Sequence, residues 1–149
     1  MKKYITITHD EEDEYRDYYL LGEVPEELYV LSLLVKNFYP DYFFSNKFIK
    51  EEKPQTNNFV IVQKKDDNVT ITAKKEYQRK ENDTFIMTFE YFITMAEDWL
   101  FRFDGNARRI FFILENNNEI DVQGDGLGWS PDQEENEEVI LPPGVGFSL

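Results

Sequence analysis

The sequence contains no cysteine and a single histidine, His9. Without cysteine the chain has no disulfide framework and no thiolate chemistry. A nucleophilic triad would have to combine His9 with one of four serines, and no G-x-S-x-G motif is present. We therefore interpret His9 as a surface residue of a turn, and we expect a protein that is not an enzyme. The four serines are Ser32, Ser45, Ser130 and Ser148.

Long apolar runs are also missing. The longest candidate, residues 28–35, contains Ser32 and falls well short of the roughly 20 residues that a membrane-spanning helix needs. The start Met1-Lys2-Lys3 resembles a signal peptide, but polar and acidic residues follow where its apolar region would lie. We expect no contact with a membrane and a cytoplasmic location.

Basic residues are absent after Arg109. The net charge is −14, and its distribution is uneven: residues 1–27 carry −6, residues 28–110 carry +1, and residues 111–149 carry −9. A nearly neutral centre is therefore flanked by two acidic ends. One interpretation is solubility, because runs of charge usually form a solvated surface. The other is a negative surface that attracts a basic partner.

The motifs for bound ions and phosphates are weak. The segment from Asp121 to Asp125-Gly126 has oxygen-rich turn chemistry, but it lacks the alternating ligands of a calcium loop. The glycines of residues 124–128 are not followed by a phosphate-binding lysine, and acids surround them. Thirty acids make some carboxylate pair inevitable, so pairs carry no signal for glycoside chemistry. We predict no metal and no cofactor.

Direct binding of nucleic acid is not expected either, because it needs a basic face. Acids interrupt the lysines and arginine between positions 64 and 80. Lysine-rich hairpins protect a sheet from edge-to-edge aggregation more often than they bind nucleic acid. The basic residues of this stretch are Lys64, Lys65, Lys74, Lys75, Arg79 and Lys80.

The stretch 88–103 has the strongest secondary-structure pattern. Its apolar residues recur at steps of three and four, which at about 100° per residue places them within an arc of about 120°. Thr88 stands at the N-cap position, Glu90 suits the first turn, and residues 104–106 are turn formers. We predict a strand through Met87 and a helix after it, although alternation over residues 85–95 also fits a longer strand. The stripe comprises Phe89, Phe92, Ile93, Ala96, Trp99, Leu100 and Phe103.

The N-terminal half predicts a strand over residues 3–8 and a helix over residues 25–38, with Pro25 as its first residue. That helix is apolar nearly all round, which indicates burial or a covering partner. Residues 9–21 continue as a helix or as a negatively charged loop. Residues 42–49 form a strand or a compact aromatic loop.

Residues 57–87 and 110–122 are dominated by strand patterns. Residues 59–62 form a continuous apolar run, typical of a strand covered on both faces. Val69, Ile71 and Ala73 alternate with threonines, as in a hairpin strand with one wet face. We predict an α+β fold in which a mostly antiparallel sheet of five to seven strands packs against two or three helices. Residues 1–149 then form one domain, with residues 124–149 as a loosely packed acidic extension.

The acidic ends also carry aromatic side chains, and this combination suits a cationic protein partner. Rings supply burial and cation–π contacts, and carboxylates supply charge-assisted pairs. We predict an inhibitor or immunity-type protein, of the kind found in bacteria and phages, that blocks a basic nuclease or another nucleic-acid-binding protein. The predicted partner-binding residues are Glu11, Glu12, Asp13, Glu14, Tyr15, Asp17, Tyr18, Tyr19, Trp129, Asp132, Glu134, Glu135, Glu137 and Glu138.

Two alternatives remain open. The first is an enzyme or small-molecule binder with a pocket between helix and sheet, lined by Tyr91, Trp99 and Phe112. The second is a structural subunit of a larger assembly, in which a partner covers the apolar helix at residues 25–38. The sequence leaves the oligomeric state and the relative position of the two acidic ends undetermined.

Overall fold

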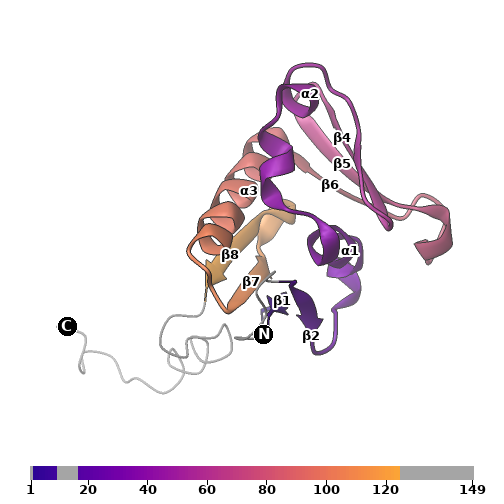
Figure 1. The fold of residues 1–149 in the computed structure, drawn as a ribbon. Helices are drawn as coiled ribbons and strands as arrows, with labels where there is room; N and C mark the ends of the chain where they lie inside the picture. Colours follow the sequence, from indigo (N-terminus) through magenta and orange to yellow (C-terminus); the bar gives the residue numbers. More distant parts are fainter. Residues whose placement is uncertain (1, 10–16, 125–149) are drawn as a thin grey trace, which may run out of the picture.

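The computed structural model describes residues 2–9 and 17–124, and it shows an α+β fold with two antiparallel sheets of four strands each (Figure 1). The predicted fold class is confirmed. The prediction of one sheet of five to seven strands is wrong, because the strands at the two ends of the described chain pair with each other and not with the strands between them.

The first sheet combines β1 (Tyr4–Thr8), β2 (Tyr19–Leu21), β7 (Arg109–Leu114) and β8 (Ile120–Gly124) in the order β2-β1-β7-β8. The apolar strand β7 is central, as its pattern predicts. Its pairing with β1 joins segments about 100 residues apart. The turn between β7 and β8 is a 3-10 turn, η4 (Asn116–Asn118).

The second sheet consists of β3 (Gln55–Thr56), β4 (Val60–Lys65), β5 (Asn68–Ala73) and β6 (Thr84–Thr88), in sequence order. The predicted alternation in β5 is confirmed, with its valine, isoleucine and alanine buried. The prediction that residues 59–62 are covered on both faces is wrong. Ile61 is exposed between two buried valines because only one face of this sheet packs on the core. A short 3-10 turn, η3 (Lys75–Tyr77), lies between β5 and β6.

Helix α1 (Tyr29–Asn37) lies between the two sheets (Figure 1). It follows a 3-10 turn, η1 (Glu26–Leu28), whose N-cap is Pro25, so the predicted helix over residues 25–38 is close to the observed one. Its apolar side chains are buried on all sides by the chain's own elements. No partner is needed to cover this helix, which removes the observation behind the structural-subunit alternative.

In the N-terminal half the structure bears on two segments for which the sequence left alternatives open. Residues 40–49 form the 3-10 helix η2 (Pro40–Phe44) and the short helix α2 (Asn46–Ile49), and neither is a strand. Their rings Phe43 and Phe48 are fully buried and contact each other, so ring packing fixes this compact segment. Residues 19–21 form strand β2 on the edge of β1 and not the end of a helix.

Helix α3 (Phe89–Asp104) begins and ends where the sequence predicts. The Tyr91 backbone N–H donates to Thr88 Oγ1 at 3.2 Å, and the Gly105 N–H donates to the Phe101 carbonyl at 3.0 Å. Phe92, Ala96 and Trp99 of the predicted stripe are buried. The rest of the stripe is half-buried, and Met95 joins the buried face.

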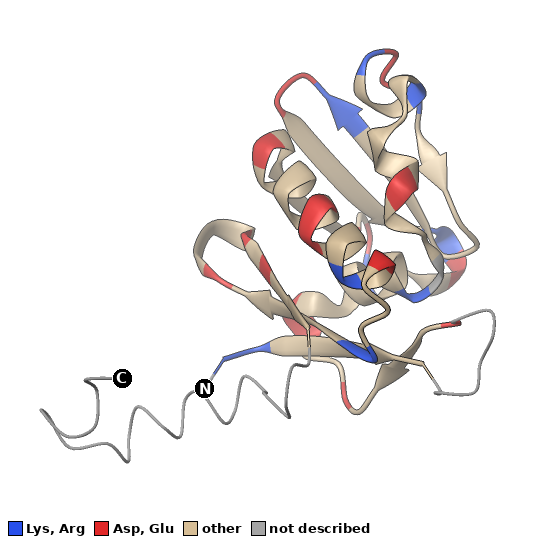
Figure 2. Cartoon of the chain, turned by 60° about the vertical axis from the view of Figure 1, so that its left-hand side comes forward, with Lys and Arg blue, Asp and Glu red and all other residues tan. Residues whose placement is uncertain are grey.

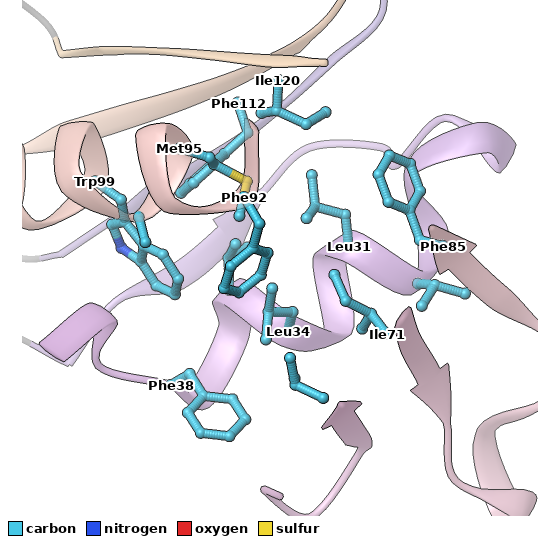
Figure 3. Close-up of a cluster of buried hydrophobic side chains, with 14 of the residues drawn as sticks. Leu31, Leu34, Phe38, Ile71, Phe85, Phe92, Met95, Trp99, Phe112 and Ile120 are labelled. Atoms are coloured by element: carbon cyan, nitrogen blue, oxygen red, sulfur yellow. The ribbon is translucent and has the colours of Figure 1, made fainter. Parts of the chain in front are cut away.

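One cluster of buried side chains contacts both sheets, α1 and α3. In Figure 3, Leu31 and Leu34 of α1 lie between Phe92 of α3 and Ile71 of β5. Helix α1 therefore connects the two sheets through the core. Across the described part of the chain, no helix is both long and apolar enough to cross a membrane.

Candidate functional site

Most of the predicted partner-binding residues lie outside the described residues; those described are Asp17, Tyr18 and Tyr19. Asp17 and Tyr19 are exposed, whereas Tyr18 is half-buried and its hydroxyl donates to the Ala107 carbonyl. Tyr18 and Tyr19 diverge because successive side chains of an extended chain point in opposite directions. The structure does not bring the three residues together on one exposed surface.

Tyr18 instead lines a pocket of about 370 Å³, which we call the aromatic pocket. It lies where β1, the C-terminal end of α1 and the C-terminal end of α3 meet. Its walls combine aliphatic and aromatic side chains with one acid and one base. They are Ile7, Asp17, Tyr18, Val35, Lys36, Phe38, Tyr39, Trp99 and Phe103.

The rings of the aromatic pocket are ordered by mutual contacts. Phe103 lies between Tyr18 and Tyr39, with ring centroids 5.8 and 5.5 Å away. Trp99 is 1% exposed, and its ring packs edge to face on Phe112, with the ring centroids 5.5 Å apart. Such edge-to-face contacts fix the orientations of the rings, so the walls of the pocket are preformed.

The two charged residues of the pocket differ in their placement. Asp17 is exposed at the pocket, immediately before Tyr18 in the chain. The Lys36 ammonium lies 4.9 Å from the ring centroid of Phe59, a cation–π contact with a ring that does not line the pocket. The alkyl chain of Lys36 therefore lines the pocket, whereas its ammonium group lies at the Phe59 ring.

His9 is buried beside this pocket and is not a surface residue, which corrects the sequence interpretation. Its ring meets Tyr18 edge to face at 4.9 Å, and its backbone N–H donates to the Arg108 carbonyl. The two described serines act locally: Ser32 Oγ donates to the Tyr29 carbonyl, and Ser45 Oγ accepts from the Phe48 N–H. Neither completes a triad with His9.

A second feature is the solvent side of α3, which we call the acidic α3 face. At about 100° per residue, Phe101 falls at the centre of this face, and acids at the i−4, i−3 and i+3 positions surround it. Phe101 is 70% exposed, more than any other large apolar side chain of the described residues. Figure 2 shows acids along α3 and on the adjoining β7–β8 hairpin. The face comprises Glu90, Tyr91, Glu97, Asp98, Phe101, Asp104, Glu119 and Asp121.

Two pKa shifts show that groups of the acidic α3 face interact. Burial raises the pKa of Asp98, and the nearby carboxylate of Asp121 raises it further. The Tyr91 hydroxyl donates to the Glu119 carboxylate, which raises the pKa of that tyrosine. Helix and hairpin therefore contribute to one negative field, which the nearby Arg102 partly offsets at Asp98.

The structure does not bring Tyr91, Trp99 and Phe112 together around one pocket. Tyr91 lies on the solvent side of α3, whereas Trp99 and Phe112 pack on each other in the core. Sequence reasoning missed Tyr39 and assigned Phe38 and Phe103 to ordinary helix stripes. The one available signal was Tyr39 directly before Pro40, where a helix must end; Tyr39 is exposed there, whereas Phe38 stays in the core.

Some of the basic side chains between positions 64 and 80 form ion pairs with acids. Arg79 holds Asp83 through two hydrogen bonds, from Nε to Oδ2 at 3.0 Å and from Nη2 to Oδ1 at 3.1 Å. Lys64 pairs with Glu52 at 3.2 Å. Within residues 2–9 and 17–124, no group of three or more histidines or acids is placed to hold a metal ion. Asp125, part of the weak calcium pattern, lies outside those residues.

Comparisons with known proteins give no relative for this chain: no protein-family model, no curated protein and no solved structure matches it.

Proposed function

We propose that this chain is a non-enzymatic acidic binding protein that docks onto the basic surface of a protein partner. The observation that carries the proposal is the acidic α3 face, where a largely exposed phenylalanine stands among carboxylates. An exposed ring among several carboxylates, with one guanidinium over it, supplies both elements of a tight interface. The ring is an apolar anchor, and the acids select partners of opposite charge.

The distribution of charge supports this placement. The described residues hold 19 of the 30 acids and 15 of the 16 bases, so they carry −4 of the net −14. The acidic α3 face is thus negative on a body that is close to balanced. Arg102 lies next to it, but its guanidinium is over the Phe101 ring and its side chain packs against Gly124. One base leaves the face strongly negative.

The partner class follows from the chemistry of a surface complementary to this face. A basic surface with room for a projecting ring is typical of proteins that bind nucleic acid. We therefore propose that this protein inhibits a nuclease or another nucleic-acid-binding protein by occupying its basic groove. The predicted acids and rings at residues 11–15 and 129–138 lie outside the described residues, and their part in this contact stays a prediction.

The test compares two triple variants with the same net charge. The first, E97Q/D98N/D104N, neutralises the acidic α3 face. The second, E51Q/E76Q/E81Q, removes three exposed acids elsewhere. Because each exposed charge pair contributes up to about 1 kcal/mol, we expect the first variant to bind the partner at least about tenfold more weakly and the second to bind like the wild type.

The partner for this measurement is the protein retained by the immobilised chain at low salt and released as the salt concentration rises. Its affinity for both variants is then measured by calorimetry, and its binding to a labelled oligonucleotide is measured with and without this protein. Equal weakening in the two variants, or a retained partner that is itself acidic, contradicts the proposal. A basic partner that binds oligonucleotide undisturbed contradicts the inhibitory part alone.

A further inference from the structure

We infer that the aromatic pocket is a binding site for an organic ammonium group. This site is separate from the docking surface on the acidic α3 face. Phe103, which lines the pocket, is two residues from Phe101 and therefore about 200° around the helix. The inference stands on the pocket's own residues and does not depend on the identity of a protein partner.

The walls of the aromatic pocket are rich in aromatic rings. The Phe103 ring contacts Tyr18 on one side and Tyr39 on the other, and the Trp99 indole also lines the pocket. The faces of these rings carry the negative part of the aromatic quadrupole, which attracts a cation within about 6 Å of the ring centre. Several rings around one space are how proteins recognise alkylated ammonium groups, whose methyl groups also bury apolar surface.

The charges are the second argument. Asp17 lines the pocket next to Tyr18 and places a negative charge there. The competing charge of Lys36 is held 4.9 Å from the Phe59 centroid, outside the lining. The net charge of the whole chain, −14, adds a long-range field that attracts cations and repels anionic ligands.

The size is the third argument. A volume of about 370 Å³ is near the lower end of the range of roughly 300–1,000 Å³ for ligand sites. It accommodates an ammonium head group with a short chain but not a dinucleotide or an extended peptide. The shared chemistry is therefore a quaternary or alkylated ammonium group, carried by a free small molecule or by a modified lysine side chain.

The experiment uses choline and its neutral isostere 3,3-dimethylbutan-1-ol, which has the same shape and no charge. Calorimetry on the full chain should show choline binding with a Kd of about 1 mM, and the isostere should bind at least about tenfold more weakly. Equal binding of the two compounds overturns the inference, because the pocket would then be merely apolar. No choline binding up to about 50 mM overturns it as well.

Two variants locate the site. Tyr39→Leu removes a half-exposed ring from the rim, and we expect it to weaken choline binding at least about fivefold with the fold intact. Phe101→Leu is the matched control: it removes an exposed ring on the other side of α3 and should leave choline binding unchanged. If both variants weaken binding equally, the cation is bound elsewhere and the inference fails.

A third comparison separates the two sources of the ammonium group. A capped trimethyllysine that binds at least about tenfold more tightly than choline identifies a modified lysine of a protein, whereas equal or tighter binding of choline identifies a small molecule. Because these probes are small, their binding does not require the proposed inhibitory partner. A choline-binding protein with no basic partner would refute the proposed function and leave this inference intact.

Discussion

At the scale of single residues, the ion pair between Arg79 and Asp83 combines a buried carboxylate with several hydrogen bonds. Asp83 is 1% exposed, and it accepts hydrogen bonds from both the side chain and the backbone N–H of Arg79. Arg79 also donates to the Glu26 carbonyl and lies 4.2 Å from the Tyr29 ring centroid. The pair therefore joins the loop before β6 to the start of α1.

This ion pair predicts an acid-dependent contribution to stability. The Arg79 guanidinium lowers the pKa of Asp83, so the charged carboxylate favours the folded state. The contribution is complete above the unfolded pKa of about 3.9 and is lost as the pH falls through the lower folded pKa. We expect Asp83→Asn to reduce the free energy of unfolding by about 2 kcal/mol at pH 7, and by progressively less below pH 4.

Urea denaturation at several pH values measures this difference. Glu81→Gln, which changes an exposed acid two residues away, is the control and should change stability by less than about 0.5 kcal/mol. A difference between wild type and Asp83→Asn that stays constant from pH 7 to pH 2 would show that the carboxylate's charge is not the stabilising feature.

At the scale of elements, α3 has two faces with different roles. Its buried side holds Phe92, Met95 and Trp99 against the core, and Trp99 also lines the aromatic pocket. Its solvent side carries the acids around Phe101. Because residues on opposite sides of a helix do not contact each other, both proposed sites can operate on one element without interference.

The N-cap of α3 gives the prediction at this scale. Thr88 is exposed, so its contribution is mainly the hydrogen bond that its hydroxyl accepts from the Tyr91 N–H. We expect Thr88→Ala to cost about 1 kcal/mol of unfolding free energy and Thr88→Ser to cost much less, since serine retains the acceptor. Thermal or urea denaturation of both variants measures this, and an equal loss would show that the cap contributes nothing.

At the scale of the whole molecule, strands near the two ends of the described chain pair with each other. Strand β1 pairs with β7 over five residue pairs. The strands of the second sheet all lie between β1 and β7 in the sequence. Helix α1 then contributes Leu31 and Leu34 to the core between the sheets (Figure 3). This arrangement couples the two sheets mechanically.

The coupling predicts that both sheets lose stability together. Leu34 is fully buried, so Leu34→Ala should lower the unfolding free energy by about 3 kcal/mol. Hydrogen exchange should show equal loss of protection for amides of β7 and β5. Loss confined to one sheet would show two independently folding units, and it would also contradict the prediction that residues 1–149 form one domain.

Helix α3 shows what local pattern can determine. Its start at Phe89 and its end at Asp104 follow from cap and turn residues that act on their immediate neighbours. Strand β5 and central strand β7 were equally predictable, because alternation and unbroken apolarity are local consequences of one or two covered faces. The rings of residues 40–49 were not, since a run of aromatics suits a strand as well as a short helix.

The candidate sites show the limit of the same reasoning. The exposed position of Phe101 follows from helical spacing, because it falls outside the predicted apolar stripe, but the neighbouring acids Glu119 and Asp121 come from a hairpin that only packing brings there. The aromatic pocket joins side chains of residues 7, 17, 18, 35, 36, 38, 39, 99 and 103, and no pattern in the sequence links these positions.

The sequence alone determined the α+β class, the bounds of α3 and the acidic character, because composition and short-range periodicity act within a few residues. Only the tertiary structure decided that the strands divide into two sheets, that His9 is buried and that Tyr18 meets Phe103. These depend on which distant strands pair, and that choice is made by the free energy of packing the whole core.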